Sequence, residues 1–472
     1  MALAPRNLEA ALVLLAALMR HGLSQVVLCP GSRSAALAQA AGLLEAHGLG
    51  LYTCVDERSA AFFALGLGRA SGQAAAVITT SGTAVANLLP AAVEADYGAI
   101  PLLLITADRP DQLKGCGANQ SVNQECFLAA SVRWLGQGDG AGLAAMADGA
   151  IAELAHAALL AARGSSQAPG PVHLNLPFAE PLHADGPALL QARAALEAAP
   201  PPRPAAMPAS LTAPAPAPAP ACPGPLPDLD RPGLVVAGPW RGFPQHWQSQ
   251  VEALGRWQRR TGWPLLADGL SGLRGQAQLE LVAGYDLLLD CTDHCPDPNL
   301  QPAQVLRLGP LPASRRLQRW LAELGGPQWL VSEADPRCLD PLGSGCQQSA
   351  AGLAGWMALW PDACWQARPD PASLELAAAW RRREGALQSW LSCALPAAAA
   401  EPALARLLGQ ALPAGVPLDR QQQPRARLGE LWRSSRALAA RVQLPRGFRH
   451  RWHPLECLRC GRGPGSGRVA QR

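Results

Sequence analysis

Apolar runs alternate with amphipathic stretches over the first 183 residues, which predicts strands and helices in turn. The apolar runs lie at 26–29, 51–55, 75–80 and 101–106, and a helical pattern at 7–21 precedes them. Strands that are apolar on both faces and are joined by helices are typical of a parallel sheet. The sequence therefore predicts an α/β domain with a doubly wound parallel sheet over residues 1–183.

A second set of short apolar segments predicts a central α/β domain over residues 233–362. The expected strands are 234–238, 264–267, 285–290, 305–308 and 328–331. The turn at Gly238 lacks a Gly-x-Gly-x-x-Gly pattern, so we expect no bound nucleotide. Arg307, Arg315 and Arg316 are expected to form a solvated basic face, with binding of a regulatory acid as the alternative.

The remaining segments differ sharply in composition. Residues 184–232 are rich in Ala and Pro, which predicts an extended linker that cannot build a core. Residues 363–418 are expected to begin a third domain. Residues 419–472 carry thirteen arginines against three acids with little apolar periodicity, which indicates a disordered, aberrant tail.

Polar and glycine residues follow four strands of the first predicted sheet. Because the carboxyl ends of parallel strands share one edge, we expect these loops to converge there. The loops are Pro30–Ser34, Asp56–Arg58, Ser81–Thr83 and Ala107–Pro110, the last continuing to Gly115–Gln120.

Glu57 is the candidate acid of this edge. It lies where an apolar strand gives way to a helix, so its carboxylate meets free backbone N–H groups and the positive end of the helix dipole. Taken alone, Asp56 and Glu57 would be interpreted as helix caps. The neighbouring loops favour a role for Glu57 in proton transfer.

Arg33 and Arg109 place two guanidinium groups at the same edge, and Asn119 and Gln120 add neutral donors and acceptors. Guanidinium groups suit bidentate recognition of carboxylates. The loops therefore predict a site for a small polyanionic acid. The alternative is that both arginines are solvated or pair with neighbouring aspartates.

Composition limits the binding partners and the cellular location that we expect for the chain. The net charge of +4 calls for no polyanion, so we expect no nucleic-acid partner. The thirteen cysteines show no disulfide-like framework, and the first apolar run is too short to span a bilayer. We therefore expect a cytoplasmic protein with reduced thiols and no membrane span.

Five ordered motifs resemble the 2-succinyl-5-enolpyruvyl-6-hydroxy-3-cyclohexene-1-carboxylate synthase family, and a sixth is similar to the segment that closes its first domain. The five are Pro30-Gly-Ser-Arg-Ser34, Asp56-Glu-Arg58 with Ala64-Leu-Gly-Leu-Gly68, Thr80-Ser-Gly-Thr-Ala-Val-Ala-Asn87, Leu104-Ile-Thr-Ala-Asp-Arg-Pro110 and Cys116-Gly-Ala-Asn-Gln120; the sixth is His173-Leu-Asn-Leu-Pro-Phe-Ala-Glu-Pro181. The resemblance covers residues 1–183.

This resemblance implies a thiamine-diphosphate enzyme fold with pyrimidine-binding, central and diphosphate-binding domains. The cofactors would be thiamine diphosphate and Mg²⁺ or Mn²⁺, and the chain would form a homodimer or a dimer of dimers. The implied reaction decarboxylates 2-oxoglutarate and adds the succinyl-semialdehyde carbanion to isochorismate, with pyruvate not yet eliminated. That step belongs to menaquinone or phylloquinone biosynthesis.

The resemblance also assigns residues. Glu57 would hydrogen-bond the aminopyrimidine ring of the cofactor, with Ser81, Gly82 and Thr83 as further cofactor-binding residues. Glu57, Gln120 and Arg33 would be catalytic. The residues implied to engage substrate carboxylates are Ser32, Arg33, Arg109, Asn119 and Gln120.

The chain departs from the family near Leu418, because no Gly-Asp motif that would supply metal ligands follows. We hypothesise a reading-frame shift, since a shifted translation of 442–461 can encode Ser-Gly-Ile-Asp-Gly; the coding DNA would decide this. We therefore expect the chain as written to be inert alone. In the tail, His450, His453, Cys457 and Cys460 have spacings loosely like a zinc site, which is the weaker alternative.

Two other functions stay open from the sequence. One is a different thiamine-diphosphate 2-oxoacid enzyme of the acetolactate synthase or decarboxylase type, which would not need both Arg33 and Arg109 for a monocarboxylate. The other is a non-catalytic remnant that acts as a binding subunit, which would show no metal-dependent cofactor binding.

Overall fold

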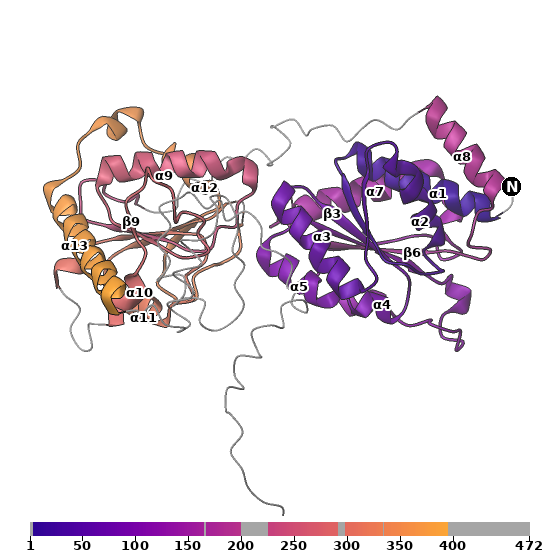
Figure 1. Cartoon of the computed structure of the whole chain (residues 1–472), viewed down its shortest axis with the longest axis horizontal. Helices are drawn as coiled ribbons and strands as arrows, with labels where there is room; N and C mark the ends of the chain where they lie inside the picture. The colour runs from indigo at the N-terminus through magenta and orange to yellow at the C-terminus, as the bar shows by residue number, and fades with distance from the viewer. Residues whose placement is uncertain (1–2, 165–166, 200–224, 291–297, 334, 395–472) are drawn as a thin grey trace, which may run out of the picture.

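The structure is a computed structural model, and it describes residues 3–164, 167–199, 225–290, 298–333 and 335–394 (Figure 1). Two six-stranded sheets form separate lobes. The predictions made for residues 395–418, for the tail at 419–472 and for its zinc alternative lie outside the described residues.

The first sheet is parallel throughout and has the order β2-β1-β3-β4-β6-β5. This confirms the predicted α/β fold class. The four expected strands are present, and β5 and β6 add to them on one side. The strands are β1 (Gln25–Leu28), β2 (Gly50–Thr53), β3 (Ala75–Thr79), β4 (Leu102–Asp108), β5 (Trp134–Gln137) and β6 (Pro171–Pro177).

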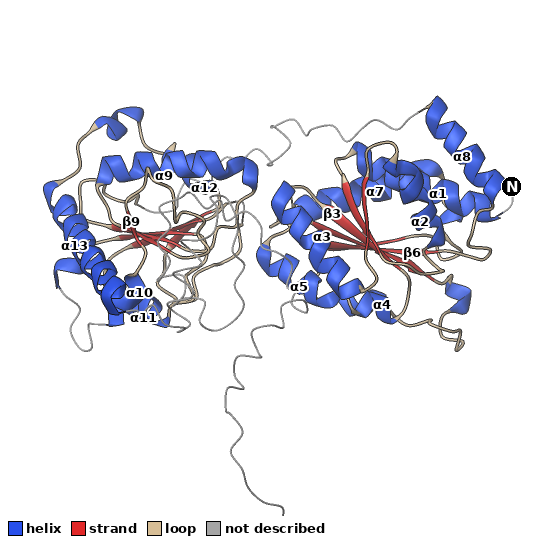
Figure 2. Cartoon of the chain, in the orientation of Figure 1, coloured by secondary structure: helices blue, strands red, loops and turns tan. Residues whose placement is uncertain are grey.

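Helices cover both faces of this sheet (Figure 2). One apolar cluster joins the sheet to α1 (Leu3–Arg20), α2 (Ala35–Glu45) and α7 (Asp148–Arg163). A second cluster on the opposite face joins it to α3 (Glu57–Ser71), α4 (Thr83–Ala86), α5 (Leu89–Gly98) and α6 (Glu125–Leu128). Short 3-10 helices lie at η1 (Asp111–Leu113) and η2 (Leu143–Ala145).

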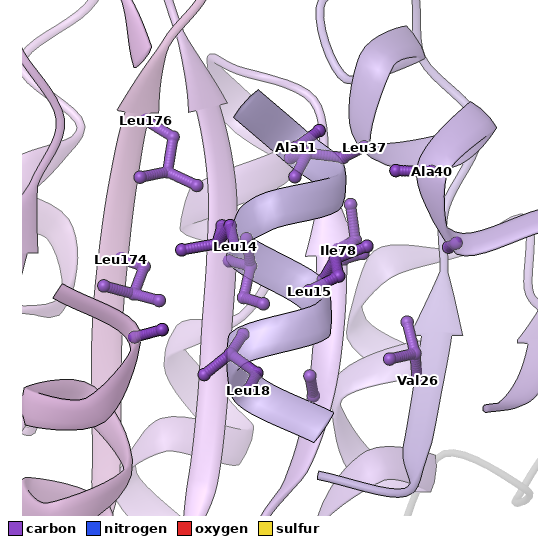
Figure 3. Packing of buried hydrophobic residues seen from close by; sticks show 14 of the residues in the cluster. Ala11, Leu14, Leu15, Leu18, Val26, Leu37, Ala40, Ile78, Leu174 and Leu176 are labelled. Carbon is purple, nitrogen blue, oxygen red and sulfur yellow. The ribbon is translucent and has the colours of Figure 1, made fainter. Parts of the chain in front are cut away.

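Helix α1 is the main support of the first cluster. Leu14, Leu15 and Leu18 are fully buried and pack toward Ile78 of β3 and Leu174 of β6 (Figure 3). Burying each such leucine contributes on the order of 2 kcal/mol relative to leaving it exposed. The packing of α1 therefore stabilises the sheet whose carboxyl edge carries the site loops.

The second sheet is also parallel and has the order β12-β11-β10-β7-β8-β9. Its strands are β7 (Leu234–Ala237), β8 (Leu265–Ala267), β9 (Leu281–Val282), β10 (Val305–Leu308), β11 (Gln328–Val331) and β12 (Gln347–Ser349). Helices α9 (Trp247–Thr261) and α12 (Gly352–Met357) contribute to one apolar cluster. Helices α10 (Tyr285–Asp290), α11 (Arg315–Glu323) and α13 (Pro371–Ala394) contribute to the cluster on the other face. Short 3-10 helices lie at η4 (Pro244–His246), η5 (Pro298–Leu300) and η6 (Asp362–Gln366).

Two expectations about segments differ from the structure. Residues 285–290, expected as a strand, form α10, because a short apolar run does not distinguish a buried strand from a buried helix. Part of the expected extended linker forms α8 (Gly186–Ala198), where the Asp185 side chain caps the helix by accepting a hydrogen bond from the backbone N–H of Ala188 at 2.9 Å.

Helix α13 also differs from its expected role at the start of a third domain. Its Trp380 is fully buried in the core beside the second sheet, and the indole N–H donates to the carbonyl of Leu300 at 3.2 Å. Residues 371–394 therefore complete the second lobe.

Arginine side chains join the two lobes. The Arg69 guanidinium donates to the carbonyl of Arg241 at 2.7 Å. In the reverse direction, Arg337 of the second lobe donates to the carbonyl of Asp96 in the first lobe at 2.8 Å. The Arg337 guanidinium also pairs with the Asp335 carboxylate of its own lobe at 2.8 Å. Among the described helices, none is both long and apolar enough to cross a bilayer.

Candidate functional site

The carboxyl edge of the first sheet gathers the predicted loops. Because all strands are parallel, the segments after β1, β2, β3 and β4 leave the sheet on one side, as does the segment after β6. These segments carry Arg33, Glu57, Ser81, Arg109 and Glu180 respectively. The topology therefore confirms that the four expected loops share an edge.

Glu57 is the first residue of α3. The preceding Asp56 caps the helix, because its carboxylate accepts a hydrogen bond from the backbone N–H of Ser59 at 2.7 Å. The Glu57 carboxylate accepts a hydrogen bond from the Asn87 side-chain amide at 3.2 Å. Burial, and then the nearby Glu57 carboxylate, raise the pKa of the Cys29 thiol to about 12. Glu57 thus follows the end of β2, and its carboxylate is hydrogen-bonded to the residue that ends α4.

Arg109 is buried and tied to the loop after β3. Its guanidinium donates to the Ser81 hydroxyl and, at 3.0 Å, to the carbonyl of Gln120. Gln120 has a positive φ of 56°, which is uncommon for a residue with a side chain. Burial, and then repulsion from Arg33, lower the pKa of Arg109.

Arg33 is buried to 7% exposure. It donates to the carbonyl of Phe178 at 2.9 Å and pairs with the Glu180 carboxylate at 3.0 Å. Its Nε is buried without a hydrogen-bond partner in the described residues. The sequence allowed a pair between Arg33 and a neighbouring aspartate, but the partner comes from the segment after β6.

The buried side-chain amide of Gln124 connects the segments around the site. The Gln124 side chain, fully buried, accepts from the backbone N–H of Gly82 at 3.0 Å. It donates to the carbonyl of Ala107 at 3.0 Å and to the Asn175 side-chain oxygen at 2.7 Å. Asn175 in turn donates to the Asp108 carboxylate at 2.9 Å. The loop after β3 and the carboxyl ends of strands β4 and β6 are thus linked through one side chain.

Lys114, the chain's single lysine, forms ion pairs in the same region. Its ammonium lies 3.0 Å from the buried Asp108 carboxylate and also pairs with Glu125. Burial alone would lower the pKa of Lys114, but hydrogen bonds to Glu125 and Asp108 raise it. The ammonium therefore stays charged and holds the segment after β4 near α6.

The predicted site residues form separate contact groups at this edge. Arg109 is hydrogen-bonded to Ser81 and Gln120, whereas Arg33 contacts Phe178 and Glu180. Glu57 bonds to Asn87 and is not hydrogen-bonded or ion-paired to either arginine within the described residues. The others lie in the same loops: Gly82 is buried, Ser32, Thr83 and Asn119 are exposed, and the Ser32 hydroxyl is 3.5 Å from the His183 ring nitrogen.

Three supporting residues were missed by the sequence analysis: Gln124, Asn175 and Glu180. Asn175 gives a detectable signal, because a polar side chain in a fully buried strand requires a buried partner. Gln124 and Glu180 lie in irregular segments and give no such signal. Their partners include Arg33 and Gly82, which lie in loops far away in sequence.

The second sheet has a pocket at its own carboxyl edge. It is lined by Gly238, Trp240, Gln250 and Glu333 among others. Burial raises the pKa of Glu333 to about 7. The pocket contains none of the predicted cofactor or substrate residues.

The prediction of a solvated basic face in the second domain is wrong for Arg307. This residue in β10 is 1% exposed and pairs with the Asp340 carboxylate at 2.7 Å. Arg316 pairs with Asp286 at 3.1 Å, whereas Arg315 is exposed. Arg307 is therefore a structural residue of the sheet.

No metal-ligand cluster was found near the predicted site among the described residues. Groups of three or more His, Cys, Asp or Glu side chains that could hold an ion do not occur in this part of the chain.

The Glu57 carboxylate suits the pyrimidine end of thiamine diphosphate. It accepts one hydrogen bond, from Asn87, and keeps further acceptor positions for a ring N–H.

Family comparisons agree with this arrangement. Residues 8–130 match the family described as "Thiamine pyrophosphate enzyme, N-terminal TPP binding domain". Residues 230–414 match "Middle domain of thiamine pyrophosphate". The two sheets and the edge loops thus define a thiamine pyrophosphate enzyme.

Individual relatives identify the branch. A 2-succinyl-5-enolpyruvyl-6-hydroxy-3-cyclohexene-1-carboxylate synthase of Synechococcus sp. (strain RCC307) is 52% identical over 88% of this chain and 68% of its own length. The enzymes of the same name from Synechococcus sp. (strain CC9605) and Prochlorococcus marinus (strain MIT 9313) are 48% and 45% identical, over 87% and 84% of this chain and 69% and 68% of their own. This chain belongs to the 2-succinyl-5-enolpyruvyl-6-hydroxy-3-cyclohexene-1-carboxylate synthase family.

Proposed function

We propose that this chain acts in the thiamine-diphosphate-dependent decarboxylation of 2-oxoglutarate and the addition of the resulting four-carbon unit to isochorismate. The product is 2-succinyl-5-enolpyruvyl-6-hydroxy-3-cyclohexene-1-carboxylate, with pyruvate not yet eliminated, on the route to menaquinone or phylloquinone. The observation that carries the proposal is the pair of buried guanidinium groups, Arg33 and Arg109, at the sheet edge that also carries Glu57.

The proposed role of Glu57 is to hold the aminopyrimidine ring of the cofactor. When bound, thiamine diphosphate supplies the electron sink for decarboxylation. Glu57 shares a hydrogen bond with a ring nitrogen and so sets where the proton on the ring resides. The Asn87 amide and the start of α3 position the carboxylate. Ser81, Gly82 and Thr83 complete this end of the site.

Arg33 and Arg109 bind substrate carboxylates in this proposal. Both 2-oxoglutarate and isochorismate carry two carboxylates, which matches two buried cations at one edge of the sheet. Ser32, Asn119 and Gln120 provide neutral hydrogen bonds at the exposed side of the same loops. An acetolactate synthase or decarboxylase would bind a monocarboxylate and would not need both guanidinium groups.

Further parts of the proposal concern the metal, the assembly and the compartment. Mg²⁺ or Mn²⁺ would bind the diphosphate through oxygen ligands, because these are the ligands that such hard cations prefer. The family assembly is a homodimer or a dimer of dimers, and since this chain as written lacks the Gly-Asp motif, its cofactor site is complete only beside a subunit that carries a diphosphate-binding domain. Its location is the cytoplasm.

A mixed-subunit product assay tests this function. The chain is combined with the Synechococcus RCC307 synthase in which the acid aligned with Glu57 is changed to Gln, together with thiamine diphosphate, Mg²⁺, 2-oxoglutarate and isochorismate. Product measured by mass spectrometry should rise well above that of the altered enzyme alone. Acetolactate from pyruvate, or no product above background, would contradict the proposal.

A further inference from the structure

Glu180 forms an uneven ion pair with Arg33. The two side chains are 3.0 Å apart, but the Arg33 side chain is 8% exposed and the Glu180 side chain is 70% exposed. An exposed carboxylate exchanges readily with water and other ions, whereas a buried guanidinium does not. The cation is therefore fixed and its partner is replaceable.

Arg33 keeps unused binding capacity. One of its terminal nitrogens donates to the carbonyl of Phe178, the other meets Glu180, and Nε is buried without a partner in the described residues. Since a buried donor without an acceptor is unfavourable, a ligand oxygen at this position would stabilise the site. The structure thus shows a donor that Glu180 does not satisfy.

Asp108, another acid at this edge, already has several partners. The Asp108 carboxylate receives hydrogen bonds from the backbone N–H of Arg109 and from Asn175, and it pairs with Lys114. Glu180 is the ion-pair partner of Arg33, and after Asp108 it is the next acid whose charge offsets the repulsion at Arg109.

We propose that Glu180 is a displaceable counter-anion of Arg33, which gives way to a carboxylate of the incoming dicarboxylic acid and so sets the affinity of this site. The inference rests on the proposed role of Arg33 in carboxylate binding. Until the ligand arrives, Glu180 reduces repulsion between the guanidinium groups. On binding, the ligand carboxylate takes the place of Glu180, whose side chain moves into water.

Calorimetric titration of the full chain with glutarate, a dicarboxylate that cannot be decarboxylated at a 2-oxo group, tests the inference. Removing the competitor in Glu180→Gln should tighten glutarate binding about two- to fivefold at low salt, the value of an exposed ion pair. Glu153→Gln on α7 is the matched control, because it removes one exposed negative charge from a helix that carries none of the site residues. Its affinity should equal that of the unaltered chain.

Several results of the glutarate titration would contradict the inference. Weaker or unchanged glutarate binding in Glu180→Gln, an equal gain in Glu153→Gln, or no glutarate binding to any of the three proteins would overturn the inference. Butyrate, which carries a single carboxylate, should show a smaller gain. If Glu180→Gln tightens glutarate binding but the mixed-subunit assay yields no product, the counter-anion stands and the proposed reaction fails.

Discussion

Replacing Gln124 with Met should loosen the loops that hold the proposed site. Met is similar in length but removes the amide, so the backbone N–H of Gly82 and the carbonyl of Ala107 lose the hydrogen bonds that Gln124 makes with them. Asn175 keeps the hydrogen bond that it accepts from the Thr106 hydroxyl at 2.9 Å. At roughly 1–2 kcal/mol for each buried group left unpaired, the free energy of opening should fall by about 2–4 kcal/mol.

Amide hydrogen exchange measured by mass spectrometry reports this opening directly. Peptides that cover the Gly82 turn should exchange roughly thirty- to a thousandfold faster in Gln124→Met, since about 1.4 kcal/mol corresponds to a factor of ten. Gln112→Met is the control, because Gln112 is exposed in the neighbouring 3-10 helix η1. Exchange at the Gly82 turn within threefold of the unaltered chain would refute the view that Gln124 holds these loops.

Three further changes have defined outcomes. Burial raises the pKa of Glu333 from 4.5 to about 7, so the folded chain keeps this proton after the unfolded chain has lost it. Stability of the second domain should therefore fall by up to about 3 kcal/mol between pH 4.5 and pH 7, and Glu333→Gln should remove most of that slope in urea titrations followed by tryptophan fluorescence. Arg109→Lys keeps the charge but loses the planar fork, so glutarate affinity measured by calorimetry should weaken about tenfold; an unchanged affinity would remove Arg109 from the site. Arg337→Ala leaves the buried Asp335 with Arg241 as its remaining ion-pair partner and should lower stability by about 1–3 kcal/mol in thermal unfolding, whereas no loss would show that the contact between the lobes is weak.

The sequence predicted the first domain well because its strands have a strong local signal. The apolar runs at 26–29 and 101–106 are buried on both faces of the sheet, and such runs are recognisable without knowledge of their neighbours. The parallel arrangement then placed the loops at one edge. Asp56 as a helix cap also followed from residue type and position alone.

Failures of prediction arose where neighbours distant in sequence decide the outcome. Residues 285–290 are a short apolar run that packs as a helix against α11 and α13, both distant in sequence. Arg307 lies in a strand and is buried because Asp340, more than thirty residues later, pairs with it. Glu180 and Gln124 act through partners that only the folded sheet brings close.

The central claim is that Glu57 supplies the acid of a thiamine-diphosphate site, and the mixed-subunit assay with Glu57→Gln tests it most directly. Both forms of the chain are combined with the synthase that lacks its own acid, and product is measured from 2-oxoglutarate and isochorismate. Loss of proton transfer by a positioned side chain typically costs a hundredfold or more, so the mixture with Glu57→Gln should fall about a hundredfold below the mixture with the unaltered chain. Equal product from the two mixtures would contradict the account.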